Sequence, residues 1–178
     1  MRDHPCAGQE HTGLLSHPYP LVRAGGLFLL VVGSALVSGA IHWRWRVGLL
    51  AGGVAIATLV TTVATPTLVS GLARPSHSQL IALCAAVLLQ ALLIPLSLHA
   101  TRNRDSSARW LTVFFVVGLH FLPMAVAFGP VVMVLGLAIM LNAGIGLWKP
   151  SEIDLRHSWL ADGLLKVAAG IMMMLGVA

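Results

Sequence analysis

The amino-acid sequence predicts an all-α integral membrane protein that folds as one bundle of six transmembrane helices. Of its 178 residues, 57% are hydrophobic and 10% are charged, which leaves too few polar side chains to cover a water-soluble globule. The apolar residues gather in six runs of about 18 to 23 residues, and each run is long enough to cross a hydrocarbon core of roughly 30 Å. Both observations favour lipid as the surrounding medium.

The chain divides into a polar tail, residues 1–22, and a single transmembrane domain, residues 23–178. Prolines interrupt the tail, which predicts irregular structure there. Its candidate metal ligands are His4, Cys6, His11 and His17. Their spacing matches no standard zinc pattern, so metal binding and a plain solvated tail both stay open. The six expected spans are 24–41, 47–69, 80–98, 111–128, 130–148 and 159–178.

Local signals set two of the span boundaries. Ser38-Gly39-Ala40 resembles a signal-peptide cleavage site, but Arg44 and Arg46 follow directly and resist translocation, which favours an uncleaved first span. Gly129-Pro130 divides an apolar stretch about twice as long as one span, and Pro is well tolerated at the first position of a helix. The fourth and fifth spans are therefore expected to form a tight hairpin.

Basic residues are distributed unevenly between the two sides of the membrane. The first, third and fifth loops carry seven Lys and Arg residues, whereas the tail and the other two loops carry three. The positive-inside rule then places the odd-numbered loops in the cytoplasm and both termini outside. An aromatic belt is expected at the cytoplasmic interface, formed by Trp43, Trp45, Trp110, Trp148 and Trp159.

The fourth span carries the strongest functional signal. It places His120 and Pro123 three residues apart, and both are costly in lipid unless neighbouring helices satisfy them. Pro123 has no N–H, so it leaves the carbonyl of Leu119 as an acceptor beside the imidazole. Four polar residues lie at nearly one depth, about 9 to 13 Å from the cytoplasmic helix ends at 1.5 Å per residue, namely Gln90, His120, Asn142 and Lys166. We expect the pathway of a proton or a small polar solute to pass through this level, next to these four side chains.

A second interpretation of the polar residues is structural. Asn and Gln often link membrane helices, each pair contributing about 1 kcal/mol, and this role stays open for Gln90 and Asn142. Asp162 and Lys166 are four residues apart on one helix face, so their spacing predicts a local ion pair. Lys166 could equally extend toward the cytoplasm and serve topology alone. For His120 a functional role and a packing role are both open, and a nearby ammonium of Lys166 favours the neutral imidazole.

Small residues at four-residue spacing predict close contacts between helices. Gly48 and Gly52 form a GxxxG motif, and Ser34 and Ser38 form a similar small-residue pair. Assembly into a homo-oligomer through such faces is a further expectation.

The two halves of the chain show a faint internal repeat. Leu30-Val31-Val32-Gly33 and Phe115-Val116-Val117-Gly118 lie at the same point of the first and fourth spans. With three helices in each half the repeats would be inverted, an arrangement found in many transporters.

One stretch carries a resemblance to known sequences. Gly118-Leu119-His120-Phe121-Leu122-Pro123-Met124-Ala125, followed by a glycine-containing fifth span and a closing Asp162-Gly163-Leu164, resembles a group of small uncharacterised bacterial multi-pass membrane proteins. The resemblance covers mainly the C-terminal half, and its most specific part is the His-Phe-x-Pro core. It implies a multi-pass membrane protein and brings no activity, cofactor or substrate with it.

The sequence therefore predicts a non-enzymatic membrane protein, with small-solute or proton-linked transport as the favoured function. The expected site residues are His120 as the titrating group with Pro123, Asn142, Gln90, Lys166 and Asp162 around it. The alternative is a non-catalytic assembly or stress-related subunit whose polar residues only hold helices together. HExxH and GxSxG motifs and paired intramembrane carboxylates are absent from the sequence, which argues against an enzyme. No nucleic-acid partner, metal or cofactor is predicted.

The charge distribution yields a test of topology. A reporter that is active only in the cytoplasm, fused to Ala178, is expected to give no signal, because both termini should lie outside. The same reporter inserted after Asn103, in the third loop, provides the matched control and should be active. A strong signal from the Ala178 fusion with a silent Asn103 insertion would reverse the orientation.

Overall fold

The computed structural model describes residues 19–68, 76–148 and 154–176, which form six α-helices and one short 3-10 turn. The elements are α1 (Val22–Ile41), η1 (Trp43–Trp45), α2 (Arg46–Leu68), α3 (His77–Ala100), α4 (Ser106–Phe128), α5 (Pro130–Trp148) and α6 (Leu155–Met174). The all-α prediction is confirmed, and α5 has the bounds that the fifth apolar run predicts. The tail residues considered as metal ligands lie outside the described part of the chain.

Helices α1 to α5 are long and apolar enough to cross a membrane. Helix α6 also has 20 residues but is less apolar, because it carries Arg156, Asp162 and Lys166. It begins four residues earlier than expected, since the Asp154 side chain caps it by accepting a hydrogen bond from the backbone N–H of Arg156. The lengths and compositions of these helices fit an integral membrane protein.

Local signals explain two further helix ends. Helix α3 starts with a capping box in which the Ser76 hydroxyl accepts from the backbone N–H of Gln79, and the Gln79 side chain accepts from the N–H of Ser76. Between α4 and α5 the chain turns at Gly129, whose φ of 97° favours glycine, and Pro130 starts the next helix. The predicted hairpin is confirmed.

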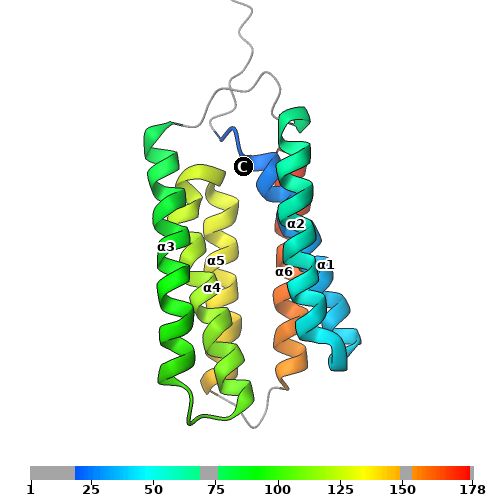
Figure 1. Ribbon diagram of the computed structural model, residues 1–178, viewed down its shortest axis with the longest axis vertical. Coiled ribbons are helices and arrows are strands. Elements are labelled where there is room, and N and C mark those ends of the chain that lie inside the picture. The colour runs from blue at the N-terminus through cyan, green and yellow to red at the C-terminus, as the bar shows by residue number, and fades with distance from the viewer. Residues whose placement is uncertain (1–18, 69–75, 149–153, 177–178) are drawn as a thin grey trace, which may run out of the picture.

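The contacts between helices place them around an incomplete ring in the order α3, α4, α5, α6, α1 and α2. Helix α1 packs against α2 and α6, α4 packs against α3 and α5, and α5 also contacts α6. Within the described residues no packed interface joins α2 to α3, so the ring is open on that side. Figure 1 accordingly shows two groups, with α1, α2 and α6 on one side and α3, α4 and α5 on the other. Most side chains of α2 and α3 are exposed, as expected for helices that face lipid.

Glycines allow the closest helix contacts. A Cβ on Gly33 of α1 would lie 2.8 Å from the carbonyl oxygen of Gly163 on α6, and a Cβ on Gly170 would lie 2.8 Å from that of Gly26. The two backbones therefore approach at two points seven residues apart on each helix. Gly118 of α4 and Gly136 of α5 form an equivalent contact. Such pairs bring van der Waals packing where lipid offers no hydrophobic driving force between helices.

The GxxxG motif has no role in packing within the described chain. Gly48 and Gly52 have no atom within 4 Å of the place where a Cβ would stand, and Ser34 is exposed. The contact between α1 and α2 instead lies at Gly53, where an added Cβ would overlap the Cβ of Ala35. The four-residue spacing thus identified a small-residue face that is open in the described chain, and its expected role in a homo-oligomer stays a prediction.

Aromatic rings join two helices, α4 and α6, and the 3-10 turn at one end of the bundle. The rings of Trp43, Trp110 and Phe114 pack edge-on against Trp159, with centroid distances of 5.9, 5.1 and 5.1 Å. Trp159 is completely buried, whereas Trp45 and Trp148 are exposed. The expectation of a lipid-interface belt is therefore wrong for Trp159, which is a core residue.

Arg156 fastens the start of α6 to the end of α1. Its Nε donates to the carbonyl of Ala40 at 2.6 Å, and Nη2 donates to that of Ile41 at 3.4 Å. Carbonyls at a helix C-terminus have no partner inside the helix, so this contact satisfies two of them with a charged donor. In the sequence analysis Arg156 was only one of the seven basic residues of the odd-numbered loops that predict the topology.

The glycine contacts can be tested by adding a single methyl group. Gly33→Ala is expected to lower stability by about 1–3 kcal/mol, because the new Cβ meets the backbone of α6 rather than a movable side chain. Gly48→Ala is the matched control and should be neutral or stabilising by up to about 1 kcal/mol, since its site is open and Ala favours a helix. Melting temperatures in detergent micelles measure both. Equal effects would mean that the α1–α6 contact is not tight.

Candidate functional site

A groove of about 580 Å³ lies between the two groups of helices. All six helices contribute to its lining, and α2 and α3 form the two edges that do not close on each other. Its volume lies within the range of roughly 300–1,000 Å³ that is usual for small-molecule sites. Most of the lining is apolar, including the rings of Phe28, Trp110, Phe114, Phe121 and Phe128.

The groove is long and follows the bundle axis. On α4 its lining extends from Trp110 to Phe128, which corresponds to about 27 Å at 1.5 Å per residue. That length approaches the hydrocarbon thickness of roughly 30 Å. His120 stands about 15 Å from the Trp110 end and about 12 Å from the Phe128 end, so it lies near the middle.

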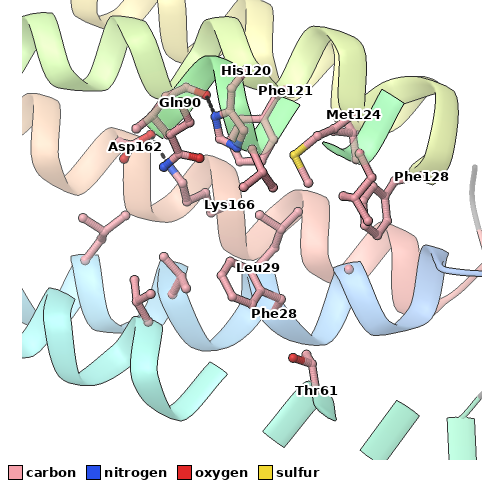
Figure 2. Close-up of a pocket in the computed structure, with 18 of the residues that line it drawn as sticks. Phe28, Leu29, Thr61, Gln90, His120, Phe121, Met124, Phe128, Asp162 and Lys166 are labelled. Carbon is pink, nitrogen blue, oxygen red and sulfur yellow. Dashed lines mark hydrogen bonds and ion pairs between the residues drawn. The ribbon is translucent and has the colours of Figure 1, made fainter. Parts of the chain in front are cut away.

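Polar groups of the groove gather at this middle level (Figure 2). Gln90 of α3, His120 of α4, and Asp162 and Lys166 of α6 all line the groove. The structure thus brings together four of the six residues that the sequence singled out. His120, Asp162 and Lys166 are buried, and Gln90 is half-buried. A cluster of this kind inside an apolar groove is the best candidate for a binding site in the described chain.

The ion pair that the four-residue spacing predicts is present. Lys166 Nζ donates to Asp162 Oδ1 at 2.5 Å, and both side chains are almost completely buried. The ammonium also lies 5.9 Å from the ring centroid of Phe121, within reach of a cation–π contact. Lys166 therefore stays inside the bundle and does not extend to the membrane surface. The two opposite charges cancel, so the part of the groove that α6 lines carries no net charge.

His120 is oriented by its own helix. Its Nδ1 lies 2.5 Å from the carbonyl oxygen of Val117, and since a carbonyl only accepts, Nδ1 carries the proton of the neutral ring. Nε2 is then left as an acceptor. The ring also packs on Phe121 with a centroid distance of 4.4 Å. The expected acceptor was the carbonyl of Leu119, freed by Pro123, but His120 instead bonds to the carbonyl of Val117, which lies two residues earlier.

Two predicted site residues lie away from the groove. Asn142 Nδ2 donates to the backbone carbonyl of Ser158 at 2.9 Å and so ties α5 to α6. This contact matches the structural interpretation of Asn142. Pro123 is half-buried in α4 and does not line the groove. Depth alone placed Asn142 with His120, because depth gives the position along a helix and not the direction in which a side chain points.

Sequence patterns did not indicate the aromatic walls of the groove. Trp110 had been assigned to the membrane interface, and Phe28 and Phe121 were ordinary members of apolar runs. Thr61 and Thr62 on the α2 edge bond backbone carbonyls of their own helix at 2.7 Å, so they add little polarity to the groove. Near the aromatic cluster, Ser158 Oγ and Trp159 Nε1 are buried without a hydrogen-bond partner in the described chain.

The helices and the groove define an integral membrane helical bundle with a partly open intramembrane groove. The chain belongs to the family of unknown function DUF6609, whose match covers residues 15–177. No curated protein and no solved structure matches it. The family match spans almost the whole chain and fits the expectation of an uncharacterised group, which had rested mainly on the C-terminal half.

The buried ion pair generates a test of the site. Lys166→Met is expected to destabilise the protein by about 3–5 kcal/mol, because it leaves the Asp162 carboxylate buried without a counter-charge. Combining it with Asp162→Asn should restore most of that loss, since neither charge then remains. Unfolding in mixed detergent micelles measures the free energy of all variants. A double variant no more stable than Lys166→Met would show that the two charges are not coupled.

Proposed function

We propose that this protein transports a small solute across the membrane and that proton exchange at His120 accompanies the transport. The observation that carries the proposal is the position of the polar cluster. The groove extends over most of the bilayer thickness, and the accepting Nε2 of His120 stands near its midpoint. Transporter sites often lie at this depth, at the interface of two helix groups.

The surroundings of His120 support a reversible proton exchange. Lys166 and Asp162 face it from α6, and Gln90 faces it from α3. The parts of α1, α2 and α5 that line the groove contribute no ionisable side chain. Binding of a solute at the Asp162–Lys166 pair therefore changes the charges next to the group that is proposed to exchange protons.

The pattern of helix contacts agrees with an inverted repeat. When α1, α2 and α3 are exchanged with α4, α5 and α6, the α1–α2 contact maps onto α4–α5 and the α1–α6 contact maps onto α4–α3. The seam between α2 and α3 then corresponds to the seam between α5 and α6. In the described chain the α2–α3 seam is open, whereas α5 and α6 are packed together. Such asymmetry between equivalent seams supports alternating access by one half moving against the other.

The orientation belongs to the same proposal. The N-terminal end of α1 and the C-terminal end of α6 lie at one end of the bundle, where Gly26 meets Gly170. With the basic loops inside, that end faces away from the cytoplasm of a bacterial cell.

A role as an assembly subunit is the second candidate. The observation in its favour is the open small-residue face of α2, where Cβ atoms added to Gly48 and Gly52 would have open space around them in the described chain. A second copy of the chain could pack there, because GxxxG faces bring membrane helices together. In that case the polar cluster would serve only to hold α6 in place.

Proton flux into proteoliposomes separates these functions. The protein is reconstituted with a pH-sensitive dye inside the vesicles, and a potassium diffusion potential drives proton entry at two external pH values. His120→Gln is expected to reduce the flux to that of protein-free vesicles, because the amide is polar but cannot accept a proton at these pH values. His99→Gln is the matched control, since His99 is exposed at the end of α3 and outside the groove.

The melting temperature shows whether each variant is folded. Flux that is the same in His120→Gln and in the parent protein would contradict the role of His120. A parent protein without flux above protein-free vesicles would contradict transport and favour the assembly subunit.

A further inference from the structure

The groove is continuous with the surrounding lipid along the seam between α2 and α3. Val54 of α2 and Val87 of α3 line it, yet 40% and 56% of their surfaces are exposed. Within the described residues no packed contact joins α2 to α3, so no helix interface closes the groove between them. In a membrane the outside at this level is hydrocarbon. A molecule dissolved in the bilayer can therefore reach the groove without passing through water.

The walls fit a molecule without net charge. Asp162 and Lys166 neutralise each other at 2.5 Å, and His120 is the one further ionisable group among the described residues that line the groove. A carboxylate, phosphate or ammonium head would have to enter an apolar space in which its counter-charge is already paired. The groove thus excludes ordinary charged lipid heads by the cost of desolvation.

The hydrogen-bonding groups at the midpoint fit a hydroxyl. His120 Nε2 is an acceptor, and the carboxamide of Gln90 makes no hydrogen bond to another described residue. Figure 2 shows both side chains at the same point of the groove. A hydroxyl can donate to the imidazole and accept from the amide at the same time. Apolar lining continues for about 12 to 15 Å on either side of His120, which accommodates a chain in both directions.

We propose that the groove binds a neutral, elongated lipophile that enters sideways from the bilayer between α2 and α3. A hydroxyl in the middle of its chain hydrogen bonds to His120 Nε2 and to Gln90, and its two apolar arms lie along α4. This assignment rests on the proposed function in that it names the class of solute that the groove takes up.

Photolabelling tests the assignment with a defined probe. A diazirine derivative of hexadecan-8-ol is added to proteoliposomes of the full chain, and the labelled residues are mapped by mass spectrometry. Saturable labelling of groove residues on α3 and α4 is expected, with competition by unlabelled hexadecan-8-ol and not by hexadecanoate. Labelling spread evenly over the lipid-facing surfaces of all helices, or equal competition by hexadecanoate, would overturn the proposal.

Variants on one helix provide the controls. Val87→Phe should reduce groove labelling several-fold by narrowing the entrance, whereas Leu88→Phe should leave it unchanged, because Leu88 is 62% exposed and does not line the groove. Gln90→Leu should weaken competition by about fivefold, the value of one hydrogen bond. Identical labelling of Val87→Phe and Leu88→Phe would rule out entry through the seam.

The outcomes separate the ligand class from transport. Proton flux that depends on His120 without specific labelling leaves transport standing and overturns the hydroxyl lipophile as its solute. Specific labelling without proton flux supports the lipophile site and contradicts transport.

Discussion

The close approach of α1 and α6 is the contact on which the rest of the structure depends. Helix α6 carries a carboxylate and an ammonium in its middle, and such charges are stable in a membrane only when protein encloses them. Gly33 and Gly163 let the two backbones meet, while Arg156 fixes the register at one end through the last carbonyls of α1. With α6 held in this way, the ion pair is buried and points toward His120. A looser contact would expose the pair to hydrocarbon and remove the polar level of the groove.

The same contact explains why the ring is incomplete. Helix α6 joins the end of the chain to its beginning and packs between α1 and α5, so both of its flanks are used. Helices α2 and α3 each have one packed neighbour in the described chain, α1 and α4 respectively. Their remaining surfaces are apolar and therefore compatible with lipid without any partner. The groove is the space that this arrangement leaves between the two three-helix groups, and the polar cluster at its middle is formed by residues of α3, α4 and α6.

Much of the fold was predictable from the sequence, because span length and helix signals are properties of the chain itself. The bounds of α5, the turn at Gly129 and the Asp162–Lys166 pair all followed from local spacing. The directions of side chains did not, as Asn142 and Trp159 show. In a soluble protein an apolar stripe tells which face of a helix is buried, but here lipid-facing and protein-facing surfaces are equally apolar. Only the tertiary contacts decide that Asn142 faces Ser158 and that Trp159 is a core residue.

The unequal lengths of the helices have a consequence for the membrane around them. Helix α3 has 24 residues, which corresponds to about 36 Å, whereas the 19 residues of α5 correspond to about 28 Å. A hydrocarbon layer of roughly 30 Å matches α5, and the longer α3 accommodates it by tilting. Because α4 is the one helix packed against α3 in the described chain, a change in the tilt of α3 would change the width of the seam toward α2. Bilayer thickness is therefore expected to act mechanically on the proposed entrance of the groove, so that lipids with shorter or longer acyl chains would set how far it stands open.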